Sequence, residues 1–239
     1  MKKLNYILAI IVIGLVVAWY IKGKNHLNPK DTAIIVVDLQ GDFTTAKKGA
    51  LAVPEADENY LQHVQKFVNN MRDKGYQIVF TQDWHPKNHT SFARNHGKNP
   101  KLPPEMITLK RKDGTKYQQE MWPTHCVQGT ENARILLDIK EGDILQQKGT
   151  RKAYDSYSGF EDAGQQPTGL ADKLKARGIN NIIVLGLATD YCVKFTALDG
   201  VKSGFNVTFV DDLSRAIVDG AGVDEMIKAG VSKVQSKTF

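Results

Sequence analysis

Cys192 lies where a nucleophile is expected. The octapeptide GLATDYCV at 186–193 follows the apolar run 182–185 and precedes a stretch of helical periodicity. This order predicts that the thiol projects from a strand-to-helix turn. The first N–H groups of a helix lack partners within it and carry partial positive charge, so they favour a thiolate and can bind an oxyanion. We therefore expect Cys192 to attack a carbonyl carbon.

Three more reactive side chains lie where predicted strands end. Asp38 ends the first apolar run, Asp83 ends the second, and Lys148 follows the third. Ligands of open parallel sheets bind beyond the carboxyl ends of the strands, so these groups should share one crevice with Cys192. Singly, Asp38 could cap a turn, Lys148 could be solvated, and Cys192 could be a small buried hydrophobe. Together, an acid, a cation and a thiol predict nucleophilic acyl transfer.

A second group of residues has the spacing of a metal site. Asp83 and His85 are separated by one residue, so both can face one ion if the backbone is extended, and His125 offers a third ligand. Three nitrogen or oxygen ligands with open positions favour Zn²⁺, with Mn²⁺ or Fe²⁺ as alternatives. His89 is either an extra ligand or part of the lining.

The remaining histidines and the second cysteine have ordinary structural interpretations. His63 falls off the apolar face of its predicted helix, and His96 and His26 have no partners nearby, so we expect all three on the surface. Cys126 is interpreted as a small core residue beside His125. Two cysteines do not make a disulfide framework.

The elements that must position these residues alternate between strand and helix. Strands are predicted at 32–39, 77–81, 143–147, 181–187 and 206–210, with an edge strand at 232–235; helices are predicted at 58–74, 170–177, 192–203 and 224–229. Repeated alternation predicts an α/β fold, a parallel sheet with helices on both faces. Residues 84–132 show neither the alternation of a strand nor the 3.6-residue period of a helix, and they are predicted to form a long functional loop.

Length and charge limit the classes of function. A chain of 239 residues with 41% hydrophobic content is long enough for one core, which we assign to a domain at 31–239. The net charge of +6 arises mostly before residue 32, where five lysines face one aspartate. The nearly neutral remainder excludes nucleic acid as an expected partner, and the basic residues at 98–116 are interpreted as a solvated loop.

Residues 1–24 have the composition of a membrane anchor or a signal segment. An uncharged apolar run from Leu4 to Ile21 is flanked by lysines and is long enough to span a bilayer as a helix. Trp19 and Tyr20 occupy the region where a signal peptide would need small residues, which favours a retained anchor over a cleaved secretory signal. We expect the domain to face the extracytoplasmic, periplasmic side, where Cys192 would have to be kept reduced.

From Asp31 onward the chain resembles the nicotinamidase (pyrazinamidase) branch of the isochorismatase-like hydrolases. The matching stretches are VDLQGDF at 37–43, GALAVP at 49–54, QDWHPKNH at 82–89, WPTHC at 122–126, and 186–196. Each is longer than a two-residue motif, and their order and spacing agree with the family. The glycine-rich turn of the family is altered at 44–48, and the apolar N-terminus is also a departure.

The resemblance implies a Rossmann-like sheet and a metal-dependent hydrolysis of nicotinamide to nicotinate and ammonia through a cysteine thioester, a step of NAD salvage, with pyrazinamide as a further substrate. The implied residues are the triad Asp38, Lys148 and Cys192; the metal ligands Asp83, His85 and His125; the ring-binding residues Phe43, Trp122 and Tyr157; and an oxyanion hole from the N–H groups of Ala188 and Cys192. A non-proline cis peptide bond before Ala188 is also implied.

Two alternatives come from different classes of protein. Another isochorismatase-like hydrolase would act on isochorismate or an N-carbamoyl compound, but the first reaction needs no cysteine and the second branch lacks the Asp-x-His metal set. A membrane-tethered protein could bind a metal or a pyridine without turnover, yet all members of the triad are present. The sequence makes no prediction of the oligomeric state.

Overall fold

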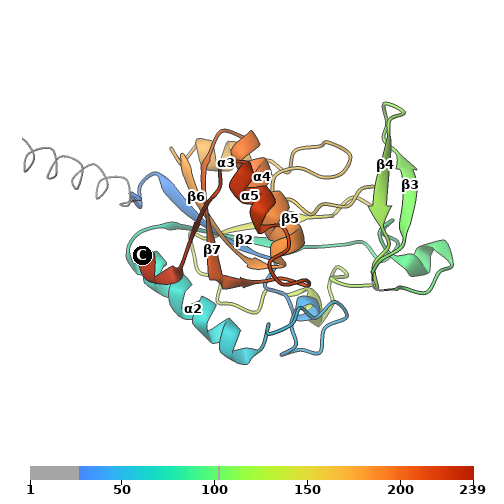
Figure 1. The fold of residues 1–239 in the computed structure, drawn as a ribbon, viewed down its shortest axis with the longest axis horizontal. Coiled ribbons are helices and arrows are strands. Elements are labelled where there is room, and N and C mark those ends of the chain that lie inside the picture. The colour runs from blue at the N-terminus through green and yellow to red at the C-terminus, as the bar shows by residue number, and fades with distance from the viewer. Residues whose placement is uncertain (1–26, 102) are drawn as a thin grey trace, which may run out of the picture.

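A six-stranded parallel sheet forms the centre of the molecule (Figure 1). The computed structural model describes residues 27–101 and 103–239. The strands are β1 (Thr32–Val37), β2 (Gln77–Asp83), β5 (Ile144–Lys148), β6 (Asn181–Leu187), β7 (Asn206–Arg215) and β8 (Ser232–Val234). Their order across the sheet is β5-β2-β1-β6-β7-β8, and every neighbouring pair is parallel.

Helices cover both faces of this sheet, as the sequence predicts. They are α2 (Glu58–Asp73), α3 (Leu170–Lys175), α4 (Lys194–Lys202) and α5 (Val223–Lys228). Successive side chains of a strand point to opposite faces. Ile34 and Val36 of β1 therefore pack with α2, whereas Ala33, Ile35 and Val37 pack with the three other helices. A strand buried on both faces reads as a continuous apolar run, which explains the sequence of β1.

The local sequence of α2 determines where this helix begins and which of its faces is buried. Its N-cap residue, Asp57, accepts a hydrogen bond from the backbone N–H of Tyr60 at 2.9 Å, which satisfies one of the unpaired donors at the helix start. Val64, Val68 and Met71 recur at helical spacing and are fully buried against the sheet.

The predicted elements are confirmed with bounds that agree within two residues, except at the end of one strand. The strand β7 extends to Arg215 instead of ending at Val210. The helix expected from Cys192 begins at Lys194, because Thr189–Val193 form one wider π-helical turn. The turn keeps Cys192 next to the end of β6, where the sequence placed it.

The prediction that residues 84–132 lack regular structure is wrong. Two antiparallel strands, β3 (Met106–Lys110) and β4 (Lys116–Glu120), form a separate hairpin away from the main sheet (Figure 1). Each strand has only five residues, β4 is mostly polar, and the apolar Ile107 and Leu109 of β3 are only partly buried, so the apolar pattern was too short to mark the pair. Asp113-Gly114 between them is a typical hairpin turn signal and could have revealed the pair. Short 3₁₀ turns lie at Gly41–Phe43, Ala93–His96, Glu131–Ala133 and Ser236–Thr238.

The predicted N-terminal membrane helix lies outside the described residues and stays a prediction, as do the domain boundaries drawn from it. Within residues 27–101 and 103–239, no helix is both long and apolar enough to cross a bilayer.

The contact between β6 and β1 gives a first prediction. Gly186 has a φ of 125°, and an added Cβ would lie 2.2 Å from the carbonyl oxygen of Val37. We expect Gly186→Ala to lower the free energy of unfolding by about 3 kcal/mol or more, measured by urea denaturation. Gly178→Ala is the control, because its φ of 73° is also positive but no described atom lies within 4 Å of the added Cβ. That variant should lose about 1 kcal/mol, and equal losses would contradict the packing argument.

Candidate active site

The carboxyl ends of four neighbouring strands bring the predicted reactive side chains together. Asp38 directly follows β1, Asp83 is the last residue of β2, Lys148 is the last residue of β5, and Cys192 lies in the turn after β6. All four are buried. These strands are consecutive in the sheet, which is why residues far apart in sequence converge at one edge.

The ammonium of Lys148 lies at the centre of the group. Its Nζ is 2.8 Å from Asp38 Oδ2 and 2.5 Å from Asp83 Oδ1. It also donates to the Ser156 carbonyl oxygen at 2.8 Å and to Cys192 Sγ at 3.4 Å. Burial alone would lower the pKa of Lys148, but the two carboxylates raise it well above its ordinary value. Lys148 is therefore a permanent cation in this site.

Asp38 has the features of a base. Its backbone lies in the left-handed region, with a φ of 49°, and Thr81 Oγ1 donates to Asp38 Oδ1 at 2.6 Å. The other oxygen meets Lys148 as an ion pair but has no partner of hydrogen-bond geometry in the described part of the chain. Burial raises the pKa of Asp38, although Lys148 opposes that shift. A carboxylate with a raised pKa that lies beside the thiol is suited to accept a proton.

The structure corrects one part of the sequence argument about Cys192. The helix N-terminus was expected to favour the thiolate, but burial raises the pKa of Cys192 well above its ordinary value, with Lys148 opposing and Asp38 adding to the shift. The resting side chain is therefore a thiol. Sγ lies within 4.8 Å of a carboxylate oxygen of Asp38 and of one of Asp83. Activation of the sulfur therefore falls to a neighbouring base, Asp38, and not to the helix N-terminus.

The turn that carries Cys192 is closed by one carbonyl group. The Ala188 oxygen accepts from the N–H groups of Tyr191 and Val193 at 3.0 and 3.1 Å. The peptide bond between Leu187 and Ala188 is cis, as the family resemblance implies. Ala188 and Cys192 both line the same cleft.

Asp83, His85 and His125 form a buried cluster whose ligand atoms lie within 4.8 Å of one another. Asp83 Oδ2 is 3.3 Å from His85 Nε2 and 3.8 Å from His125 Nε2. Each imidazole contacts a backbone carbonyl through Nδ1: Gly149 at 2.9 Å for His85, and Pro123 at 2.8 Å for His125. When Nδ1 donates to a carbonyl, Nε2 presents its lone pair, which is the usual outer-shell arrangement of a metal-binding histidine.

The chemistry of this cluster fits a divalent cation. His85 Nε2 is buried and has no hydrogen-bond partner among the described residues. Burial, with His85 adding, lowers the pKa of His125 to about 4, so its ring is neutral. Burial opposes ionisation of Asp83, but Lys148 and His85 hold its pKa far below its usual range. Burial opposes protonation of His85, but Asp83 raises the pKa of this ring, so a bound cation would take the place of its proton. One carboxylate and two deprotonated imidazoles are a donor set that zinc accepts.

Gln40 supports the cluster and was not singled out from the sequence. Its side-chain oxygen accepts from the Asp83 N–H, and its amide nitrogen donates to the Asp83 carbonyl, both at 2.8 Å. The same nitrogen donates to Ala133 at 2.8 Å. Gln40 therefore fixes the backbone on both sides of the Asp83 side chain.

The other histidines of the described residues and Cys126 lie outside the cluster of Asp83, His85 and His125. His89 packs against His85 with ring centroids 4.3 Å apart, and its own nitrogens contact Ser91 Oγ and the Tyr154 carbonyl. It therefore lies behind a metal-ligand candidate. His63 and His96 are exposed and Cys126 is buried in the core, as predicted, whereas His26 lies outside the described residues.

A narrow cleft opens onto Cys192 and His125. Phe43, Trp122 and Tyr157 line it, as the family resemblance implies. Its other lining residues are Leu51, Val53, Asp83, Asp155, Ala188, Tyr191 and Ile217. Tyr191 was missed in the sequence, although its position directly before Cys192 was a usable signal. Mostly apolar walls above a thiol fit a flat ring that carries a carbonyl group.

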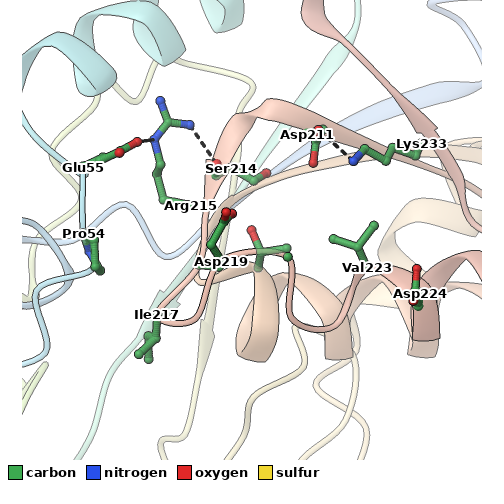
Figure 2. A pocket seen from close by; sticks show the side chains of 13 residues that line it. Pro54, Glu55, Asp211, Ser214, Arg215, Ile217, Asp219, Val223, Asp224 and Lys233 are labelled. Atoms are coloured by element: carbon green, nitrogen blue, oxygen red, sulfur yellow. Dashed lines mark hydrogen bonds and ion pairs between the residues drawn. The ribbon is translucent and has the colours of Figure 1, made fainter.

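A larger pocket of about 630 Å³ lies beside this cleft, and the two share Ile217 (Figure 2). Four of its charged side chains form pairs: Arg215 Nε is 3.6 Å from Glu55, and Lys233 Nζ is 2.9 Å from Asp211. It contains neither the thiol nor the histidine cluster, so we assign the chemistry to the narrower cleft.

Comparisons with known proteins point the same way. Residues 32–231 match the model of the isochorismatase domain. The chain is similar to the nicotinamidase of Acinetobacter baylyi, with 39% identity over 87% of this chain and 94% of that protein. It is 42% identical to the nicotinamidase of Escherichia coli over 77% of this chain and 83% of that protein. The crystal structure of the pyrazinamidase of Pyrococcus horikoshii in complex with zinc matches with a TM-score of 0.69, 34% identity, and coverage of 86% of this chain and 99% of that one.

The close approach of Gly149 to His85 predicts a variant with a damaged metal site. Gly149 has a φ of 61°, and an added Cβ would lie 2.3 Å from His85 Cε1, so the ring must move. We expect Gly149→Ala to weaken zinc binding by about tenfold or more, measured by competition with a chromogenic chelator. Gly142→Ala, at a φ of 90° with no described atom within 4 Å of the added Cβ, should bind zinc normally. Unchanged affinity in Gly149→Ala would remove His85 from the ligand set.

Proposed function

The chain belongs to the isochorismatase family, and from this membership we propose that it is a nicotinamidase, an amidohydrolase that converts nicotinamide and water to nicotinate and ammonia. The observation that carries the proposal is the placement of the Cys192 thiol beside Asp38 and Lys148 at an aromatic cleft that also reaches the Asp83, His85 and His125 cluster. Pyrazinamide differs by one ring nitrogen and should enter the same cleft.

The cleft would hold the pyridine ring between aromatic walls. Phe43, Trp122 and Tyr157 offer ring faces and edges, and Leu51 and Ile217 add aliphatic surface. This environment removes apolar ring surface from water and excludes solvent from the reacting amide. Fixing the ring in this way places the carboxamide next to the sulfur, and such orientation alone can supply several kcal/mol of the barrier reduction.

We propose that Asp83, His85 and His125 hold a divalent ion, most naturally Zn²⁺. A bound ion would supply a Lewis acid for a ring nitrogen of the substrate and so fix the ring's orientation. The zinc complex of the pyrazinamidase relative supports this assignment. The buried Nε2 of His85, which faces Asp83 Oδ2 at 3.3 Å and has no partner of hydrogen-bond geometry among the described residues, supports it from within this chain.

The first half of the reaction forms a thioester. Asp38 accepts the Cys192 proton while Sγ attacks the carboxamide carbon, and the positive charge of Lys148 offsets the growing negative charge. We assign the substrate oxygen to the N–H groups of Ala188 and Cys192. Asp38 then returns the proton to the amide nitrogen, the C–N bond breaks, and ammonia leaves.

The second half regenerates the thiol. Asp38 takes a proton from a water molecule, whose oxygen attacks the thioester carbon. The C–S bond breaks, nicotinate is released, and the proton passes back to Cys192. Throughout both halves Lys148 keeps its proton, because the two carboxylates beside it hold its pKa high.

A hydrolase of the same family that acts on other substrates is the nearest alternative. The combination of a buried thiol with a carboxylate and histidine cluster beside one cleft favours an aromatic amide over isochorismate or an N-carbamoyl compound. A binding protein without turnover would have no use for Asp38 and Lys148 placed around Cys192.

The two cysteines provide a matched test of covalent catalysis. We expect Cys192→Ala to abolish ammonia release from nicotinamide while the protein still binds zinc, because the sulfur is removed and the histidine cluster is kept. Cys126→Ala removes a thiol of the same type that is buried in the core, and should keep turnover within about threefold of the parent chain at a small cost in stability. Substantial turnover by purified Cys192→Ala would refute the thioester route.

We further propose that residues 1–24 anchor the protein in a membrane with the hydrolase domain on the extracytoplasmic side. The support is the uncharged run Leu4–Ile21, followed closely by lysines after Trp19 and Tyr20. We expect the full chain to sediment with membranes and resist carbonate extraction, whereas a chain starting at residue 31 should stay in the supernatant. Recovery of the full-mass chain in the supernatant would contradict the anchor, and recovery at a shorter mass would favour a cleaved signal.

A further inference from the structure

Glu120 joins three aromatic residues at the mouth of the cleft. It is the last residue of β4 in the hairpin. Its Oε2 accepts from the Tyr157 hydroxyl at 2.6 Å, and its Oε1 accepts from the Tyr191 hydroxyl at 3.2 Å. Trp122 Nε1 in turn donates to the Tyr157 hydroxyl oxygen at 2.9 Å. One carboxylate therefore fixes two tyrosines that both line the cleft.

The rings that Glu120 fixes also pack on each other. The centroids of Tyr157 and Tyr191 are 5.5 Å apart, and Trp122 meets Tyr191 edge-on at 5.1 Å. Tyr157 stacks on Phe195 of α4 at 5.4 Å. Lys194 lines the same outer groove as Glu120, but its ammonium pairs with Glu225 at 3.0 Å. The Glu120 carboxylate instead accepts from the two tyrosine hydroxyls. Hydrogen bonds to a carboxylate are stronger than those between neutral groups, so this contact holds the rings in one position.

Tyr157 and Tyr191 are shared by two hollows. One is the narrow cleft that contains Cys192, and the other is an outer groove of about 500 Å³. The groove is bordered by Met106, directly opposite Glu120 in the hairpin, and by Val218, and these side chains are 54% and 63% exposed. The two tyrosine rings are therefore the wall that closes the cleft on the side of the groove.

We propose that Glu120 is a positioning residue that sets substrate size, because its carboxylate holds Tyr157 and Tyr191 as a wall between the Cys192 cleft and the outer groove. The inference rests on the proposed amidase function. With the wall in place, the cleft admits a single six-membered ring. Without it, the cleft and the groove join, and a bicyclic heteroaromatic carboxamide can place its second ring in the groove.

The test compares nicotinamide with quinoline-3-carboxamide, which carries a fused second ring. We expect Glu120→Ala to raise the ratio of kcat/KM for the bicyclic amide to that for nicotinamide by about tenfold or more, chiefly through a lower KM for the bicyclic amide. The KM for nicotinamide should rise while its kcat changes little, because the triad is untouched. A general loss of structure would instead lower kcat for both substrates together.

Matched variants separate the contact from its surroundings. Glu120→Gln keeps a side chain of the same shape that can bond both hydroxyls, and should restore the parent ratio. Glu105→Ala removes a glutamate at the start of the same hairpin that pairs with Lys98, and should also keep the parent ratio. If Glu120→Ala does not fold, the double variant Tyr157→Phe with Tyr191→Phe removes both hydroxyls but keeps the rings, and it should show the same rise in the ratio.

A binding measurement separates this inference from the proposed function. Calorimetry with the Cys192→Ala chain should detect nicotinamide but not quinoline-3-carboxamide, and adding Glu120→Ala should make the bicyclic amide bind. A ratio and a binding pattern unchanged by Glu120→Ala would overturn the role of Glu120 even if the parent enzyme hydrolyses nicotinamide. A parent enzyme inert toward nicotinamide would instead overturn the proposed function, while the binding comparison would still decide the role of Glu120.

Discussion

The buried ammonium of Lys148 is the interaction on which the rest of the site depends. It contacts Asp38 and Asp83 at the same time, and both carboxylates are themselves buried. Two negative charges this close would repel each other strongly in a medium of low dielectric constant, so the site needs the cation between them. Loss of one partner from a buried ion pair typically costs about 3–5 kcal/mol. Lys148 thus connects Asp38, which transfers protons, to Asp83, which belongs to the candidate metal site.

The same cation gives the two carboxylates different properties. Asp38 is held at high pKa by burial, while Lys148 and His85 overcome burial at Asp83 and keep it ionised. Paired acids whose pKa values are pushed apart by their surroundings commonly divide the chemistry between them. Here Asp38 is suited to move protons and Asp83 to hold a cation. Thr81 donates a hydrogen bond to the Asp38 carboxylate, and Gln40 accepts one from the Asp83 backbone N–H. These contacts hold each aspartate in its own position.

Much of this arrangement could be predicted from the sequence because it follows from strand ends. Buried parallel strands read as apolar runs, and the polar residue that ends each run must lie at one edge of the sheet, which placed Asp38, Asp83 and Lys148 correctly. The hairpin was missed because its strands are five residues long and bury Ile107, Leu109 and Tyr117 only in part. Glu120 was missed with it, since a contact between a hairpin carboxylate and tyrosines up to 71 positions away leaves no local pattern. The state of the Cys192 thiol depends on burial, which spacing does not reveal.

The most direct test of the account is to acid-quench the protein during turnover of nicotinamide and to analyse its peptides by mass spectrometry. We expect one added nicotinoyl group on the peptide that contains Cys192, present only while substrate remains. Continued release of ammonia and nicotinate with Cys192 never acylated, or with the nicotinoyl group on another side chain, would contradict the convergence of Cys192, Asp38 and Lys148 on a single reaction.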